Sequence, residues 1–581
     1  FRSIVKSVDE VEHVYTFADD DQVMVTARFK VGVDPDAAAV RIHERIRGNL
    51  DRIPAGIPEP LIQTRGINDV PSLVLTLSPK PGAAGQWSDQ ALYELAGKLR
   101  TEVAKVDNVG LTFIVGGRPR EIRIEPDPAR MARHGVSLAA LMDTVRQANR
   151  AFPAGQLRNG GDAVQVTAGK TFTDAGQIGL LALPSAGGQT VYVRDVAEVV
   201  EGPREDQARS WRFARQGDAW SEAPSVSLAI AKRKGANAVV VSHAVLERVE
   251  ALKGSLLPDS LSVDITRDYG ETANEKANEL LFHLALATVS IVVLIGFAIG
   301  WREAAVTAVV IPTTILLTLF ASNLMGYTIN RVSLFALIFS IGILVDDAIV
   351  MIENIARHWA MKDDRSRVDA AVEAVAEVGN PTVVATLTVV AALLPMLFVS
   401  GLMGPYMAPI PVNASAAMVF SFFVAVVIAP WLMVRFARKA VAEGHAAHAE
   451  HGEGRLGAAY RAVAGRVIAT RRSAWIFLIA VGLATLLSGA MFYTKTVTVK
   501  LLPFDNKSEL QVIADLPEGT SLETTQRVLN DLAAITRTVP EVTAIDAFAG
   551  TSAPFNFNGL VRHYYQRNRP EMGDLSVTLA P

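Results

Sequence analysis

The sequence predicts a polytopic α-helical membrane protein that carries large α+β domains outside the bilayer. Of its 581 residues, 50% are hydrophobic and only 20% are charged. The mean hydropathy of +0.26 is too high for a purely soluble or disordered chain. Six stretches of mostly apolar residues are long enough to cross a membrane. Two polar regions, residues 1–279 and 494–581, are too long to be loops.

The composition excludes several classes of function. The net charge of −3 excludes a chain-wide basic surface for nucleic acid. Cysteine is absent, which excludes disulfides, Cys-ligated zinc, iron–sulfur clusters and thiol catalysis. We find no nucleophile–base pair, and GGRPRE (116–121) lacks the glycine spacing of a phosphate-binding loop. We therefore expect neither an enzyme nor a cofactor.

The loops between the apolar stretches predict the topology, because Lys and Arg collect on the cytoplasmic side. Three alternate loops carry thirteen basic residues, whereas the two intervening loops hold only Arg331. Both long polar regions therefore share the other side, the periplasm. The basic loops are 301–303, 357–381 and 435–474. The predicted spans are 280–300, 304–326, 333–356, 382–400, 414–434 and 475–493.

The polar regions are predicted to fold as small split βαβ units. VMVTARFKV (23–31) alternates like a strand, and 34–50 has helical periodicity after an Asp cap. The pattern starts again after the last span, which indicates a second copy of the first half that the chain includes only in part. Further strands are expected at 72–78, 110–115, 120–125, 190–194, 509–517 and 542–548, and further helices at 88–105, 137–149 and 521–536.

The predicted cytoplasmic linker, 435–474, contains three histidines at helical spacing: His445, His448 and His451. Histidine-rich tracts can bind metal. No second cluster of ligands accompanies them, so we favour a solvated linker and expect no metal site.

Two adjacent carboxylates, Asp346 and Asp347, lie near the middle of the third predicted span. One ionised carboxylate at the bilayer centre costs about 2.5–3.5 kcal/mol, so two unpaired ones would cost roughly 5–7 kcal/mol. Burial disfavours the ionised form of a carboxyl group, and a second carboxylate disfavours it further. The pair therefore suits a proton relay better than a polar contact that only joins helices.

Consecutive helical residues point about 100° apart, so the two carboxylates can face two neighbouring helices. Few other polar groups are available within the spans: Ser340 one helix face away, and Thr382, Thr386 and Thr388 on the next span. No Lys or Arg lies inside the spans, so the cationic partner must come from elsewhere. Glu353, Asn354 and Thr386 are candidates for an accessory proton path. For Glu353 and Asn354, an ordinary interfacial helix end is the alternative.

The segment GILVDDAIV (342–350), continuing into Ile352-Glu353-Asn354, resembles the resistance–nodulation–division (RND) efflux pumps. Further similarity lies in 120–149, 191–203 and 500–521. The resemblance implies a proton-driven bacterial inner-membrane permease of the multidrug branch with twelve membrane helices in two repeats. It also implies that this chain is a fragment without the first helix and the last five. The Lys-bearing helix that faces the Asp pair in the family would be among these.

By this resemblance the chain divides into porter, docking and membrane parts. The implied parts are a partial porter subdomain (1–80), a second porter subdomain (81–279) with a docking insertion around 133–225, a bundle of five helices (280–434), the cytoplasmic linker (435–474), the helix that opens the second repeat (475–493) and the start of a second periplasmic porter region (494–581). The implied partners are a periplasmic adaptor protein, an outer-membrane channel and two further copies in a homotrimer. The proton-motive force would supply the energy.

The substrate class is less well indicated by the sequence. The family's drug pumps line a pocket with phenylalanines on two porter strands, where this chain has Ser72 and Val115. A heavy-metal exporter is one alternative, although that branch has a single Asp in this helix and we find no methionine pair or carboxylate triad for a metal. A sterol-sensing or translocation-assisting membrane protein is another. Such a protein needs no duplicated α/β domains, so we expect efflux of hydrophobic or amphiphilic compounds.

The topology can be tested by single-cysteine labelling, because the chain has no cysteine of its own. A cysteine introduced near residue 450 should react with a membrane-impermeant maleimide only after the inner membrane is opened. A cysteine at an exposed position in residues 1–279 should react in intact spheroplasts. Labelling near residue 450 from the periplasmic side would show that the predicted topology is inverted.

Overall fold

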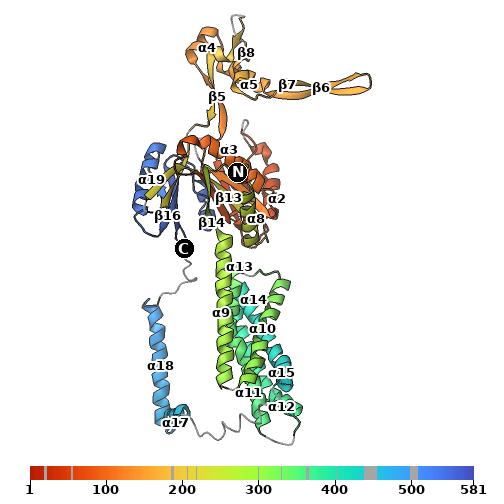
Figure 1. Cartoon of the computed structure of the whole chain (residues 1–581), viewed down its shortest axis with the longest axis vertical. Coiled ribbons are helices and arrows are strands. Elements are labelled where there is room, and N and C mark those ends of the chain that lie inside the picture. The colour runs from red at the N-terminus through yellow and green to blue at the C-terminus, as the bar shows by residue number, and fades with distance from the viewer. Residues whose placement is uncertain are drawn as a thin grey trace. The chain divides into compact units, whose positions relative to one another are not determined.

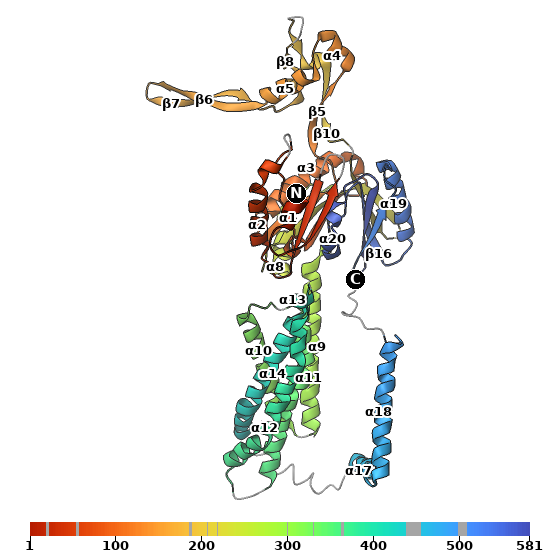
Figure 2. The ribbon, with the colours of Figure 1, turned by 180° about the vertical axis from the view of Figure 1, so that it is seen from behind.

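Figures 1 and 2 show a computed structural model of the chain. The chain folds into two compact units. One unit joins Phe1–Gln63 to Thr272–Asn506, and the other joins Thr64–Glu271 to Lys507–Pro581. The structure describes residues 1–18, 23–53, 57–184, 189–205, 207–217, 219–298, 300–328, 330–361, 365–401, 403–436, 455–497 and 508–580. The histidines at 445, 448 and 451 lie outside these residues.

A four-stranded antiparallel sheet forms the first core of the unit Thr64–Glu271 with Lys507–Pro581. Its strand order is β14 (Leu261–Asp268), β3 (Leu73–Pro79), β13 (Val226–Lys232) and β4 (Val109–Val115). Helices α3 (Asp89–Val103) and α8 (Ala238–Ala251) begin at the caps Ser88 and Asn237. They pack their apolar faces into a core with residues such as Leu75, Leu92, Leu228 and Val245. The strands predicted at 72–78 and 110–115 and the helix predicted at 88–105 are confirmed.

A five-stranded sheet in the same unit combines two distant parts of the chain. Strands β11 (Arg209–Gln216) and β12 (Ala219–Pro224) precede the first span. Strands β15 (Glu509–Asp515), β16 (Val542–Ala549) and β17 (Met572–Leu579) follow the last one. Strand β11 pairs antiparallel with β16, and helix α19 (Leu522–Thr536) packs on the sheet. Strands that pair in one open sheet cannot lie on opposite sides of a bilayer, so these two parts of the chain lie on the same side of the membrane.

A buried ion pair crosses the β11–β16 ladder. Arg212 Nη1 lies 2.8 and 2.7 Å from the two carboxylate oxygens of Asp546, and the two side chains are only 8% and 2% exposed. Asp264 on β14 lies 3.5 Å from Arg212 Nε. Burial alone would lower the pKa of Arg212, but the Asp546 carboxylate raises it above its ordinary value. The guanidinium therefore stays charged.

A smaller α/β module is inserted between β4 and β11. Strands β5 (Arg120–Pro126) and β10 (Ala197–Pro203) pair antiparallel at its base. Beyond them come helices α4 (Pro128–His134) and α5 (Leu138–Ala148), the hairpin β6 (Arg150–Asn159)–β7 (Asp162–Lys170), and α6 (Ala175–Gly179), β8 (Ala182–Leu183), β9 (Val191–Tyr192) and α7 (Val193–Val196). The strand predicted at 190–194 is thus shorter than expected: strand β9 has only two residues, and the helical turn α7 follows it directly.

The bounds of this module differ from the insertion predicted at 133–225. The module begins with β5 and ends with β10, because β11 and β12 belong to the five-stranded sheet. Its core is built from residues such as Met131, Leu141 and Val196. The side chains of the β6–β7 hairpin are nearly all exposed, including Phe152, Leu157 and Val164.

The other unit begins with α1 (Arg2–Lys6), the hairpin β1 (Val11–Ala18)–β2 (Val23–Phe29) and α2 (Pro35–Arg47). Helix α2 starts at Asp34, whose carboxylate accepts from the backbone N–H groups of residues 36 and 37. A small core of residues including Ile4, Val5 and Ile42 holds these elements together. The strand and helix predicted at 23–31 and 34–50 are confirmed.

Among the residues that the structure describes, six helical segments are long and apolar enough to cross a membrane, which confirms the six predicted stretches. The helices that form them are α9 (Tyr269–Ala298), α10 (Trp301–Leu324), α11 (Arg331–Ala360), α12 (Arg367–Leu393), α14 (Pro409–Phe423) running through a π-helical turn (Val424–Ile428) into α15 (Ala429–Phe436), and α18 (Arg471–Tyr493). The predicted loop 357–381 is wrong, because α11 and α12 extend over most of it. A further helix, α17 (Arg455–Ile468), lies within the predicted linker.

The buried ion pair between β11 and β16 makes a stability prediction. Asp546→Ala would leave the Arg212 charge buried without its bidentate partner, which should lower the free energy of unfolding by about 3–5 kcal/mol. Glu518→Ala is the matched control. It also removes an arginine–carboxylate pair of this unit, but the Glu518 side chain is almost fully exposed, and such pairs contribute about 0–1 kcal/mol. Thermal unfolding of the purified protein should separate the two variants, and an unchanged midpoint for Asp546→Ala would contradict this account.

Candidate functional site

The two carboxylates identified in the sequence lie on helix α11, the helix around which the bundle is built. Helix α11 contacts α10, α12, α14 and α15. Its residues Ala348, Met351, Ile352 and Ile355 are fully buried in the bundle core. A polar group on this face of α11 is therefore surrounded by side chains of other helices and not by solvent.

The two adjacent carboxylates have different surroundings. Asp347 is only 8% exposed and faces α14, where the Ser421 hydroxyl donates a hydrogen bond to it. Its second carboxylate oxygen, Oδ2, is buried and has no hydrogen-bond partner among the described residues. Asp346 is exposed on the surface of the described bundle. The two side chains therefore point in different directions, but only Asp347 faces a neighbouring helix of the described bundle, whereas the sequence led us to expect that both could.

No described Lys, Arg or His forms an ion pair with Asp346 or Asp347 within 4.0 Å. The polar neighbour Ser421 was not predicted. Thr386 is buried, but its hydroxyl donates to the Thr382 carbonyl at 2.9 Å, and Thr388 is exposed. The structure therefore does not bring Thr386 into hydrogen-bond contact with the pair.

Helix α11 carries a buried polar stripe along the face that includes Asp347. Ser333, Ser340, Asp347 and Asn354 follow one another at intervals of seven residues, and His358 lies one turn further on; all five are buried. Residues seven apart lie on the same face of a helix. The expectation that Ser340 lies one face away from the pair was therefore wrong with respect to Asp347.

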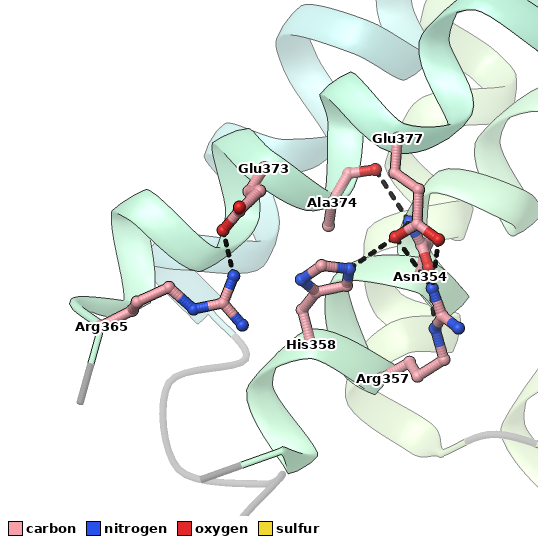
Figure 3. A network of polar contacts seen from close by, with 7 residues as sticks. All are labelled: Asn354, Arg357, His358, Arg365, Glu373, Ala374 and Glu377. Carbon is pink, nitrogen blue, oxygen red and sulfur yellow. Dashed lines mark hydrogen bonds and ion pairs between the residues drawn. The ribbon is translucent and has the colours of Figure 1, made fainter. Parts of the chain in front are cut away.

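The C-terminal end of the stripe is a hydrogen-bonded network between α11 and α12 (Figure 3). Asn354 Nδ2 donates to the Ala374 carbonyl at 2.8 Å, and its Oδ1 accepts from Arg357 Nε at 3.0 Å. Glu377 accepts from Arg357 at 2.7 and 2.9 Å and lies 2.7 Å from His358 Nε2. Glu353, in contrast, is exposed. Of the two candidates predicted here, only Asn354 is buried and belongs to this network.

His358 and Glu377 were not predicted from the sequence. The predicted span ended at 356 and the next began at 382, so both residues were placed in a loop. The helical spacing from Asp347 through Asn354 to His358 could have indicated His358, because these three residues fall on one face of a continued helix. This spacing does not indicate Glu377, which lies on α12.

An aromatic cluster lies in the unit formed by Thr64–Glu271 and Lys507–Pro581. It is near Val115, one of the two positions at which we expected a pocket phenylalanine by resemblance to the drug pumps and found none. Phe113, two residues before Val115 on β4, stacks on Phe555 with ring centroids 5.5 Å apart. Phe555 also contacts Tyr565, at 5.6 Å between centroids. Phe555 is only 4% exposed, so the cluster acts as packing and does not line an open pocket.

Comparison with known proteins places the chain in a family. A family model described as the AcrB/AcrD/AcrF family matches residues 3–568. The multidrug resistance protein MdtC of Pantoea ananatis is 26% identical over 531 residues, which cover 89% of this chain and 49% of that protein. MdtC of Yersinia enterocolitica is 28% identical over 417 residues, which cover 71% of this chain and 39% of that protein.

The chain spans about half the length, or less, of the curated relatives it matches. Its six apolar helices and its sheet-containing polar regions fit the membrane fold of this family. The match covers nearly the whole chain, including the Asp346–Asp347 helix, and it confirms the resemblance seen in the sequence. The chain belongs to the AcrB/AcrD/AcrF family of RND multidrug efflux permeases.

Proposed function

We propose that the full-length protein is a proton-driven exporter of hydrophobic and amphiphilic compounds in the bacterial inner membrane, and that Asp346 and Asp347 form its proton relay. The observation that carries this proposal is the position of Asp347. It is a carboxylic acid buried in the central helix of an apolar bundle, with one oxygen unpartnered among the described residues.

An ionised carboxylate at the position of Asp347 is energetically costly. A charged side chain in the membrane needs a counter-charge or water, and the described residues give Asp347 only the Ser421 hydroxyl. Asp347 is therefore stable when it is protonated, or when it is ionised beside a cation supplied from outside the described bundle. The exposed Asp346 carboxylate lies on the side from which such a cation could approach.

A change between these two states would move the helices. An ionised carboxylate draws a cation and water toward α11, and a neutral one allows close apolar packing around Met351 and its neighbours. Two discrete packings of one helix bundle are the basis of a conformational switch. Helix α9 begins at Tyr269 directly after strand β14, which ends at Asp268. The two elements are consecutive in the chain, and we propose that a displacement of α9 is passed to β14.

The relatives support a drug-like substrate range over the two alternatives. Each relative that we compare is a multidrug resistance protein, and neither a metal exporter nor a sterol-sensing protein is among them. We propose a periplasmic location for the sheet-containing regions and a tripartite pump with a periplasmic adaptor and an outer-membrane channel. The proton-motive force would drive transport without a cofactor.

The proton-relay proposal is tested by Asp346→Asn and Asp347→Asn in the full-length protein. Asparagine is nearly isosteric with aspartate but cannot ionise, so folding should be kept and export should fall to background in each variant. Asp369→Asn makes the same chemical change at an exposed position at the start of α12 and should keep full export. Drug-accumulation assays at matched expression provide the measurement. If both Asp346→Asn and Asp347→Asn export normally, the proton-relay proposal is wrong and the two carboxylates have only a structural role.

The assembly proposal predicts a homotrimer for the full-length protein. The β6–β7 hairpin exposes Phe152, Leu157 and Val164, and exposed apolar side chains in a group are typical of contact surfaces. Mass photometry in detergent and in nanodiscs should give three protomers per particle. Phe152→Ser combined with Leu157→Ser should increase the share of smaller particles. A monomer under both conditions for the unmodified protein would contradict the proposal.

A further inference from the structure

Two buried polar atoms on α11 have no hydrogen-bond partner among the described residues and lie on the same helix face. One is Asp347 Oδ2, and the other is His358 Nδ1. The two residues are eleven positions apart, about 16 Å along a helix axis. Asn354 lies on the same face between them, and its side chain is buried. Unpartnered buried polar atoms are rare because each costs free energy, so two of them on one stripe need an explanation.

His358 is positioned between the bundle interior and solvent. Its side chain is 8% exposed, and Nε2 lies 2.7 Å from Glu377 Oε2. Because a carboxylate only accepts, Nε2 carries the hydrogen and donates it to Glu377. In neutral imidazole the other nitrogen, Nδ1, then holds a lone pair, and this atom is the buried one. The Glu377 side chain is 50% exposed, so water reaches the carboxylate.

The charged groups around His358 are few. From α12 only Glu377 contacts the ring, since Glu373 pairs with Arg365. On α11 itself, Arg357 pairs with Glu377. Glu303 at the start of α10 and Arg435 on α15 lie on elements that pack against α11. Within the described part of the chain, neither of these two forms a hydrogen bond or an ion pair with the imidazole. Among the described residues, Glu377 is the charged group that pairs with the imidazole of His358.

We propose that His358 and Glu377 form the cytoplasmic end of the proton path that starts at Asp347, which rests on the proton-relay function proposed above. A proton released by the Asp347 carboxyl group moves along water beside Asn354 and binds to His358 Nδ1. The hydrogen on Nε2 then passes to the Glu377 carboxylate and from there to cytoplasmic water. One proton enters the imidazole and one leaves it, so the ring remains neutral and only its tautomer changes. Rotation of the ring, or the reverse tautomer change, restores the starting state.

A purely structural latch between α11 and α12 is the competing explanation for the same contacts. Arg357 distinguishes the two roles, because it joins α11 to Glu377 as His358 does but lies on the exposed side. Arg357→Gln removes the arginine contacts to Asn354 and Glu377 but leaves the proposed proton-carrying groups of Asp347, His358 and Glu377 in place. His358→Gln keeps a donor near Glu377 but cannot accept and pass on a proton. His358→Ala removes the ring and leaves space that free imidazole can enter from the cytoplasmic side.

The experiment uses everted membrane vesicles containing the full-length protein, in which the cytoplasmic face is exposed to the buffer. Proton-coupled drug uptake should fall on the order of tenfold or more in His358→Gln and His358→Ala, the scale of general acid–base transfer. Added imidazole should restore uptake in His358→Ala, measured against the same addition to wild-type vesicles. Arg357→Gln should keep most of its uptake, and all variants should show wild-type expression and particle size.

The possible results separate this inference from the proposal on which it depends. Wild-type uptake by His358→Gln would overturn it, and so would a His358→Ala defect that imidazole does not restore, because the contact would then be structural. Equal losses in Arg357→Gln and His358→Gln would also overturn it. If Asp347→Asn vesicles transport normally, the proton-relay function itself fails. If they are inactive while His358→Gln is normal, only the cytoplasmic end of the path has been placed wrongly.

Discussion

The burial of Asp347 in an apolar helix bundle is the constraint on which the rest of this account depends. An ionised carboxylate in that position costs about 2.5–3.5 kcal/mol on insertion scales, and one hydroxyl from Ser421 compensates only part of it. Helix α11 therefore has to be the contact partner of four other segments, since only a surrounded helix can shield a carboxyl group from lipid. The polar stripe from Ser333 to His358 places five hydrophilic side chains of α11 on one buried face, whereas Asp346, Glu353 and Arg357 are exposed. Lipid then meets mainly apolar side chains.

A second constraint acts outside the membrane, where β11 and β16 form one ladder although some 330 residues separate them in the chain. All six candidate spans lie between these two strands. An even number of crossings returns the chain to the side from which it started, so the ladder and the number of spans agree without reference to loop charges. The buried Arg212–Asp546 pair fixes the register of this ladder, because a shift by one residue would bury both charges without partners. Thr64–Glu271, before the membrane bundle, and Lys507–Pro581, after it, are thus parts of one folded unit.

The sequence predicted the features that depend on periodicity and composition. The six apolar segments, the strand at 72–78 and the helix at 88–105 follow from repeats of 2 and 3.6 residues and from hydrophobic length. It failed where tertiary contacts decide. The pairing of β11 with β16 is long-range and has no local signal, so β11 and β12 were assigned to the wrong module. The helical extension of α11 to Ala360 was missed because a charged segment was taken to be a loop, although contacts between Asn354, His358 and Glu377 stabilise it as a helix.

The central claim is that the buried carboxyl group of Asp347 gains and loses a proton during function. Infrared difference spectroscopy of the full-length protein, recorded between acidic and alkaline buffer, measures this directly. The account predicts the carbonyl-stretch band of a protonated, weakly hydrogen-bonded carboxylic acid at low pH, its loss at high pH, and its absence from the difference spectrum of Asp347→Asn. A spectrum of Asp347→Asn that still contains the same band, or a wild-type spectrum without it, would contradict the account.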